Sequence, residues 1–142
     1  METNSKKSVL FLCTGNSCRS QMAEGWARHL KGRSIDAYSA GTHTHGLNPN
    51  AVRAMGECGV DISKHRSKTI AELPPIAFDL VVTVCGAAHE MCPVFPGARK
   101  TIHVGFDDPP KLAQSARTDD EAMVHYRRVR DEIRDFVAAL AV

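Results

Sequence analysis

Residues 8–20 read SVLFLCTGNSCRS, and the rest of the chain can be interpreted from this stretch. Its apolar run, Val9–Leu12, has the length and composition of a strand buried on both faces of a parallel sheet. The run ends at Cys13, passes through a Gly-Asn pair, and continues from Ser20 with the periodicity of a helix. A turn of this kind directs backbone N–H groups toward one point, beside the partial positive charge of a helix N-terminus. The stretch therefore predicts an anion-binding loop.

Two side chains of this loop suggest its chemistry. Arg19 supplies a planar guanidinium, whose fixed fork of donors suits a tetrahedral oxyanion. Beside that cation and the helix N-terminus, Cys13 is expected to be largely thiolate, the form in which cysteine is a nucleophile. The residues expected to bind the oxyanion are Thr14, Gly15, Asn16, Ser17, Cys18, Arg19 and Ser20.

The composition predicts one catalytic domain over residues 8–142, preceded by a flexible polar tail over residues 1–7. The formal net charge of +2 among 142 residues gives no reason to expect a nucleic-acid or membrane partner. The N-terminal apolar run is too short for a secretory or membrane-spanning segment, so we expect a cytoplasmic protein. Five cysteines in that reducing compartment suggest redox or catalytic work or simple burial. We expect a monomer without a cofactor or a bound metal.

The remaining patterns alternate between strands and helices, which predicts an α/β fold with a four-stranded parallel sheet flanked by helices. The expected strands cover residues 8–12, 35–40, 79–84 and 99–104, with the second shorter and nearer an edge. The expected helices cover residues 20–31, 49–58 and 119–140, the second opened by Asn48-Pro49 and the third by a capping box at Thr118. In the last helix the inner stripe is expected to be Ala122, Tyr126, Val129, Ile133, Phe136, Val137 and Leu140. Its solvated face is expected to hold Arg127, Arg128, Arg130, Glu132 and Arg134.

Chemically active residues follow three of these strands, and the C-terminal ends of parallel strands share one edge of the sheet. The third strand ends in Cys85, and the fourth is followed by the segment GFDDPP, which contains Asp108. Asp108 fits either a turn before proline or a general acid held over the pocket. His43 and His45, in the loop after the second strand, could begin a metal site, but a solvated loop is favoured because no further ligand cluster is nearby.

The segment CGAAHEMC places Cys92 seven residues after Cys85. Such a pair could carry a disulfide from a buried thiol to the surface. Two alternatives remain on this segment alone: a zinc pair, for which only His89 is a nearby third ligand, and two unrelated thiols. Cys58, near the end of a helix, is expected to be a small buried apolar residue.

Cysteine, five residues, then Arg-Ser is the signature of the low-molecular-weight tyrosine phosphatases and of the thioredoxin-coupled arsenate reductases that share their fold. The chain resembles the reductases in CTGNSCRSQMAEGW, AGTHTHGLNP, DLVVTVC, CGAAHEMC, GFDDPP and YRRVRDEI. The resemblance implies that arsenate is reduced to arsenite by Cys13 as nucleophile, with Arg19 binding the oxyanion and Asp108 as general acid. It further implies that Cys85 and Cys92 form the disulfide shuttle that resolves Cys13 and that thioredoxin regenerates.

The chain departs from the family at a potassium site that some members possess. Residues corresponding to three of its ligands are present as Asn16, Glu24 and Ser39, but a Thr and an Asp align with Arg66 and Lys68. A cationic side chain could replace the ion, so potassium independence is expected. The segment 111–118 is also longer than expected. The rival interpretations are a low-molecular-weight protein tyrosine phosphatase using Cys13, Arg19 and Asp108, and a non-enzymatic oxyanion or metalloid sensor.

Overall fold

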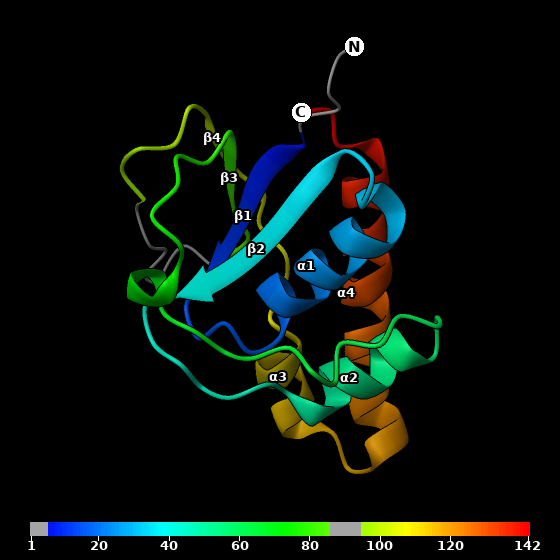
Figure 1. Cartoon of the computed structure of the whole chain (residues 1–142). Coiled ribbons are helices and arrows are strands. Elements are labelled where there is room, and N and C mark those ends of the chain that lie inside the picture. Colours follow the sequence, from blue (N-terminus) through cyan, green and yellow to red (C-terminus); the bar gives the residue numbers. More distant parts are fainter. Residues whose placement is uncertain (1–5, 86–94) are drawn as a thin grey trace.

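The fold is that of a computed structural model, which describes residues 6–85 and 95–142 (Figure 1). The stretches 1–5 and 86–94, the second of which contains Cys92 and His89, lie outside the described residues. The elements are β1 Lys7–Cys13, α1 Arg19–Lys31, β2 Ile35–Gly41, α2 Pro49–Gly56, η1 Ile70–Glu72, β3 Leu80–Thr83, β4 Thr101–His103, α3 Pro109–Leu112, η2 Ala113–Ser115 and α4 Asp119–Ala139.

The described strands form one parallel sheet in the order β2-β1-β3-β4, which confirms the predicted fold class. β1 is a central strand, and its residues from Val9 to Leu12 are fully buried, as their continuous apolar character predicts. Two details of the prediction were wrong. The strand begins at Lys7, inside the predicted tail, because Lys7 pairs with Ile35. β2 lies at an edge as expected, but with seven residues it is as long as β1.

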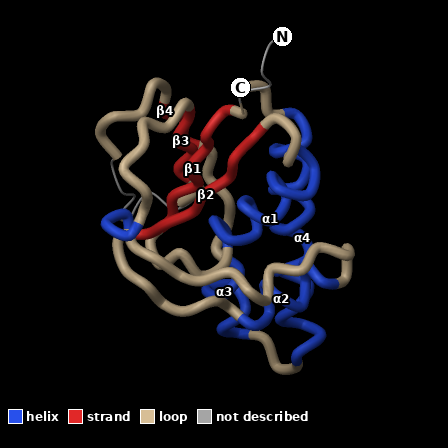
Figure 2. Tube along the Cα trace, viewed as in Figure 1, coloured by secondary structure: helices blue, strands red, loops and turns tan. Residues whose placement is uncertain are grey.

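The helices α1, α2 and α4 gather on one side of the sheet (Figure 2). The larger hydrophobic cluster lies there and joins alternate residues of β1, such as Val9 and Phe11, to the apolar faces of these helices. A smaller cluster around Leu10, Leu12 and Phe78 covers the opposite face, where η1 and loop residues pack in the described part of the chain. The alternation of β1 side chains between two cores fixes its register. This fixed strand delivers Cys13 to the C-terminal edge.

The long helix α4 follows the predicted capping pattern, since Thr118 Oγ1 accepts a hydrogen bond of 3.1 Å from the Glu121 backbone N–H. Its buried stripe contains the predicted Tyr126, Val129, Ile133 and Val137 together with Met123, whereas the predicted Ala122 and Phe136 are only partly buried. Arg130, predicted to be solvated, is instead 9% exposed. Its guanidinium donates a hydrogen bond of 2.9 Å to the carbonyl oxygen of Ala54. This bond satisfies one of the carbonyl groups that have no partner within the last turn of α2. The apolar pattern alone could not reveal that partner.

Glu57, at the end of α2, joins this helix to α4. Its carboxylate accepts two hydrogen bonds of 2.9 Å from Arg127 and one of 3.0 Å from Arg130. These bonds, with Arg127 as the main cause, lower the pKa of Glu57 from 4.5 to about 2. A carboxyl group whose pKa is lowered by folding stabilises the protein above its unfolded-state pKa.

We expect Glu57→Gln to lower the midpoint of thermal unfolding at pH 7 by about 3 °C, since a partly exposed ion pair contributes at most about 1 kcal/mol. The difference from wild type should narrow as the pH falls from 4.5 toward 2, because both proteins then carry a neutral side chain at this position. Melting curves by circular dichroism measure both quantities. Glu132→Gln, which breaks an ion pair within α4 alone, is the control. A Glu57→Gln difference that stays constant down to pH 2.5 would contradict the assignment.

Candidate active site

The loop between β1 and α1, residues 14–18, surrounds the point at which Cys13 leaves the sheet. Asn16 has a positive φ of 47°, a conformation that asparagine tolerates better than most residues. Gly41 lies against this loop, and a Cβ there would approach Asn16 N to 2.8 Å and Thr14 O to 2.6 Å. The close approach of the two backbones therefore requires glycine at the end of β2.

The carbonyl groups and the N–H groups of this loop have different partners. All five carbonyl oxygens of residues 14–18 accept hydrogen bonds from groups that lie outside the cavity. These bonds run from Thr42 N and His43 N to Thr14 O, from His45 N and Ser67 Oγ to Gly15 O, from Gln21 Nε2 to Asn16 O, from Asn48 N to Ser17 O, and from Met22 N to Cys18 O. In the described part of the chain, the N–H groups of residues 15–18 donate to no other group. The first turn of α1 also lacks an acidic residue. The loop is thus built to offer its donors to an anion.

The Asn16 side chain holds the loop through hydrogen bonds in the protein interior. Its Oδ1 accepts from the Lys68 backbone N–H at 2.8 Å and from Gln21 Nε2 at 3.0 Å, and its Nδ2 donates to Ser20 Oγ at 2.9 Å. Asn16, Ser20 and Gln21 are all fully buried. The hydroxyl of Ser20, predicted among the oxyanion-binding residues, therefore has Asn16 as a hydrogen-bond partner. Gln21 was not singled out from the sequence, although it lies in the first turn of α1, next to the loop that it supports.

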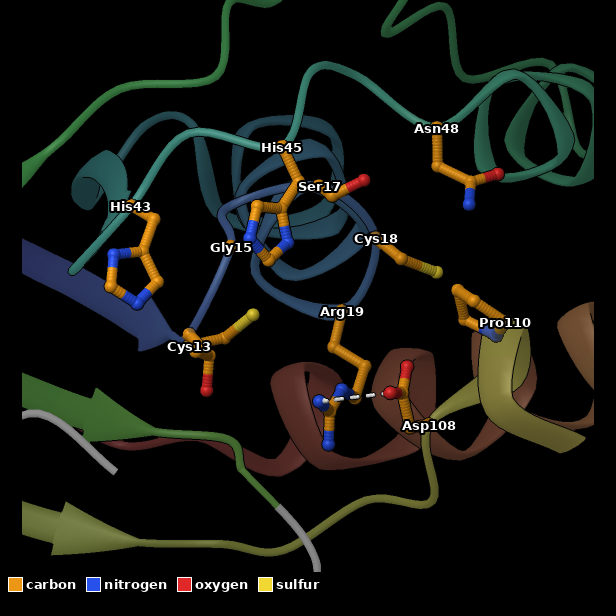
Figure 3. Close-up of a pocket in the computed structure, with 11 residues that line it drawn as sticks. Cys13, Gly15, Ser17, Cys18, Arg19, His43, His45, Asn48, Asp108 and Pro110 are labelled. Carbon is orange, nitrogen blue, oxygen red and sulfur yellow. Dashed lines mark ion pairs between the residues drawn. The ribbon is translucent and has the colours of Figure 1, made fainter. Parts of the chain in front are cut away.

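Arg19 and Asp108 meet at the open side of the loop. The Arg19 side chain is 4% exposed, donates to the Phe106 carbonyl oxygen at 3.0 Å, and forms an ion pair of 3.8 Å with Asp108 Oδ2. The neighbouring Asp107 points elsewhere, since its Oδ2 lies 2.9 Å from an Arg128 nitrogen on α4. The two adjacent carboxylates are thereby separated, and Asp108 is the one that faces the cavity (Figure 3).

The cavity itself has a volume of about 480 Å³. It is lined by Cys13, Thr14, Gly15, Ser17, Cys18, Arg19, His43, His45, Asn48, Asp108 and Pro110. Figure 3 shows the Cys13 sulfur directed toward the space between the loop and the Arg19 side chain, whereas the Cys18 sulfur points toward Pro110. Burial, and next the nearby Cys13 and Asp108, raise the pKa of Cys18 well above its usual value, which keeps this thiol neutral.

Three lining residues extend the sequence-based prediction. His43 and His45 are exposed, as expected for a solvated loop, but they also line the cavity, which the pattern did not reveal. Asn48, predicted only as a helix cap, does cap α2 by accepting from Asn50 N at 2.8 Å, and it lines the cavity too. The described residues contain no group of three or more His, Cys, Asp or Glu side chains arranged to hold a metal ion.

Cys85 lies beside the loop at the end of β3. Leu12 pairs with Thr83, so Cys13 lies one residue and Cys85 two residues beyond a matched pair of the neighbouring strands β1 and β3. Cys85 is 2% exposed, and its sulfur lies 3.9 Å from the Thr14 hydroxyl oxygen. The second thiol of the predicted pair, Cys92, falls outside the described residues. The structure therefore brings Cys13, Arg19, Asp108 and Cys85 to one edge of the sheet. Cys58, in contrast, packs partly buried against the core.

A buried carboxylate lies behind the loop. Glu24 is 3% exposed and forms ion pairs with Arg28 at 2.9 Å and with Lys68 at 3.7 Å, while the Ser39 hydroxyl donates to it. The Lys68 ammonium also donates to the Arg66 carbonyl oxygen at 3.1 Å. Burial lowers the pKa of Lys68, and Glu24 opposes that shift. The cation in this place is thus Lys68, because the Arg66 side chain turns outward to Glu72.

His65 completes this buried cluster. Its Nε2 lies 3.8 Å from a Glu24 oxygen, and its Nδ1 lies 3.0 Å from Gln21 Oε1. Burial lowers the pKa of His65, although Glu24 opposes the shift. Because Gln21 supports Asn16, the cluster is connected to the loop through the side chains of these two residues.

No helix within residues 6–85 and 95–142 is long and apolar enough to cross a membrane.

Comparison with known proteins places these features in a family. The family model described as low molecular weight phosphotyrosine protein phosphatase matches residues 8–141. An arsenate reductase from Halalkalibacterium halodurans is 54% identical over 128 residues, which cover 90% of each chain. An arsenate reductase from Bacillus subtilis is 53% identical over 127 residues, which cover 89% of each chain.

A solved structure shows the same architecture. It is described as an arsenate reductase in the phosphate binding state, and it superposes with a TM-score of 0.76 at 31% sequence identity. The superposition covers 92% of this chain and 93% of that chain. The similarity therefore extends over the sheet, the loop after β1 and the helices that support them.

Proposed function

The chain belongs to the low molecular weight phosphotyrosine protein phosphatase family, and from that premise we propose that it is an arsenate reductase that converts arsenate to arsenite. The proposal includes regeneration by thioredoxin in a cytoplasmic setting, with the enzyme acting as a monomer. It is supported by two relatives named arsenate reductase that share more than half of their aligned residues with this chain.

The observation that carries the proposal is the division of backbone groups in the loop after β1. Every carbonyl oxygen of residues 14–18 is bonded to a group that lies outside the cavity, and the N–H groups of residues 15–18 are left for the cavity in the described structure. With the Arg19 guanidinium, these donors match the oxygens of a tetrahedral oxyanion such as arsenate or phosphate. One of the structural relatives is described in a phosphate-binding state.

In the first proposed step, the Cys13 thiolate attacks the arsenic atom of bound arsenate. A sulfur–arsenic bond forms, the bond from arsenic to one of its hydroxyl groups breaks, and that hydroxyl takes a proton from Asp108 and departs as water. The ion pair between Asp108 and Arg19 holds the carboxyl group over the cavity. Arsenate thereby becomes attached to the chain with its arsenic still in the pentavalent state.

In the second step, the Cys85 thiolate attacks the Cys13 sulfur. A Cys13–Cys85 disulfide forms, the sulfur–arsenic bond breaks, and its electron pair stays on arsenic, which leaves as arsenite. Cys13 ends β1, and Cys85 follows the neighbouring strand β3, one residue beyond the position that the register sets opposite Cys13, so this attack joins residues at the same edge of the sheet. The Cys92 thiolate then attacks Cys85 and frees Cys13. A thioredoxin dithiol reduces the resulting Cys85–Cys92 disulfide.

The phosphatase interpretation uses the same Cys13, Arg19 and Asp108 but has no task for Cys85. The residues that line the cavity in the described structure include no Phe, Tyr or Trp to grip a phosphotyrosine ring. The sensor interpretation leaves the orientation of Asp108 unexplained. We therefore favour the reductase.

The proposal is tested by arsenate-dependent oxidation of NADPH in the presence of thioredoxin and thioredoxin reductase. We expect sustained turnover, with one arsenite formed for each NADPH consumed, and no oxidation when arsenate is omitted. Replacing thioredoxin by glutathione and glutaredoxin should reduce turnover to background. Brisk hydrolysis of phosphotyrosine without any arsenite would instead assign the protein to the phosphatases.

Potassium should leave this activity unchanged. The Lys68 ammonium lies 3.7 Å from Glu24 and 3.5 Å from the Ser39 hydroxyl oxygen, so a fixed cation already neutralises the buried carboxylate. We expect rates in equal concentrations of sodium and potassium chloride to agree within about 1.5-fold, because neither ion gains a charged partner. Initial rates at constant ionic strength measure this ratio. A several-fold gain in potassium would show that a metal cation binds despite Lys68.

A further inference from the structure

The segment between β2 and α2 forms one wall of the cavity. Residues 42–48, hereafter the strap, run across the outer side of the loop after β1. The strap donates backbone hydrogen bonds of 3.0–3.1 Å to the carbonyl oxygens of Thr14, Gly15 and Ser17. Because these bonds recur along its length, the strap is held in register with the loop, and its side chains have defined positions over the mouth.

Two of those side chains are imidazoles. The rings of His43 and His45 are stacked, with centroids 5.8 Å apart and planes inclined by 18°. The His45 ring lies directly on Gly15, where an added Cβ would come within 2.3 Å of its Nδ1 (Figure 3). Neither imidazole forms a hydrogen bond or an ion pair with another residue of the described structure. Their ring nitrogens are therefore available to a ligand in the cavity.

We propose that His45, supported by the stacked His43, binds the oxygen of the oxyanion that faces the cavity mouth and so makes the site selective for a free oxyanion. The loop N–H groups and Arg19 can serve the inward-facing oxygens. The outward oxygen of free arsenate or phosphate can accept a hydrogen bond from an imidazole N–H. In a phosphate ester that oxygen carries an organic group, which the His45 ring would obstruct. This inference rests on the proposed function, whose substrate preference it explains.

The direct test is calorimetric titration of the reduced protein with inorganic phosphate, which needs no turnover. We expect His45→Ala to raise the dissociation constant about tenfold, the usual effect of losing a hydrogen bond to a charged group. His43→Ala should raise it about threefold, since that ring acts through its neighbour. Thr44→Ala changes an exposed residue of the same strap that does not line the cavity, and it should stay within about twofold of wild type.

A substitution that keeps a donor separates hydrogen bonding from packing. His45→Gln retains an N–H group at similar reach, so it should recover most of the phosphate affinity lost in His45→Ala. Thermal unfolding of each variant confirms that the fold is intact before titration. Unchanged phosphate affinity in His45→Ala, or a His45→Gln variant as weak as His45→Ala, would overturn the proposal.

Steady-state kinetics test the selectivity. For His45→Ala we expect the KM for arsenate to rise about tenfold with kcat within twofold, while the KM for p-nitrophenyl phosphate stays constant or falls. An equal rise of both KM values would contradict selectivity. If no form of the protein produces arsenite, the proposed function fails, whereas the phosphate titration still decides whether His45 binds an oxyanion.

Discussion

Cys92→Ser is expected to release one equivalent of arsenite per chain and then stop, whereas Cys13→Ser should release none. Without Cys92, the proposed relay still proceeds through the attack of Cys85 on the arsenic-bearing Cys13. It then ends at a Cys13–Cys85 disulfide that has no internal thiol to resolve it. Without Cys13 no sulfur–arsenic bond forms, and arsenite production should fall below about 10⁻⁴ of the wild-type rate. Arsenite counted against chain concentration in a rapid-quench experiment distinguishes the two outcomes.

The covalent state of each variant provides a second measurement. Mass spectrometry of arrested Cys92→Ser should show a disulfide that links the peptides containing Cys13 and Cys85. Cys58→Ser is the matched control, because Cys58 is partly buried in the core and does not line the cavity, and it should turn over as wild type does. Continued cycling of Cys92→Ser would mean that another thiol or an external donor resolves Cys13.

Asp108→Asn should reduce kcat by about 10²–10³, the usual cost of losing a general acid, while Asp107→Asn should stay within about threefold of wild type. The two residues are adjacent in sequence, but only Asp108 lines the cavity and pairs with Arg19. Asp107 pairs with Arg128 on α4, where both side chains are largely exposed, so this bond should contribute little. Asparagine preserves the shape of each side chain and removes its proton donor.

The decisive comparison is the rate of the first arsenite burst in the two variants, since the burst excludes later thioredoxin steps. Phosphate affinity should change little in Asp107→Asn. Equal losses of rate in both variants would show that the loop before α3 matters as a whole and that Asp108 has no separate chemical task.

The sequence was most informative where one residue pattern has one structural solution. The continuous apolar run of β1 predicted a strand buried on both faces, and residues Val9 to Leu12 are fully buried in the middle of the sheet. The C-terminal strand ends then predicted that Cys13, Cys85 and Asp108 share an edge, as the structure shows. These features depend on the geometry of the backbone and on patterns among neighbouring residues, and both can be recognised in one amino-acid sequence.

The missed features depend on tertiary contacts between distant segments. Arg130 is buried because it donates to the buried carbonyl oxygen of Ala54, 76 positions earlier in the chain, and the apolar periodicity of the last helix does not indicate that partner. His43 and His45 were correctly expected to be exposed. Their place at the cavity follows from backbone bonds between the strap and Thr14 or Gly15, which composition does not encode. Lys68 was recognised from the sequence together with Arg66, and only the structure shows which of the two cations reaches Glu24.

The packing of α1 against α4 has a consequence for synthesis. The Trp26 indole of α1 donates to the carbonyl oxygen of Arg130 in α4 at 3.1 Å. The packing partner of α1 is therefore synthesised about a hundred residues after α1 itself. A growing polypeptide that ends before α4 leaves the apolar side of α1 uncovered, and such surfaces favour aggregation. The ribosome therefore presents the nucleophile long before it presents the helix that closes the core. We expect the oxyanion pocket to assemble only once α4 has been made.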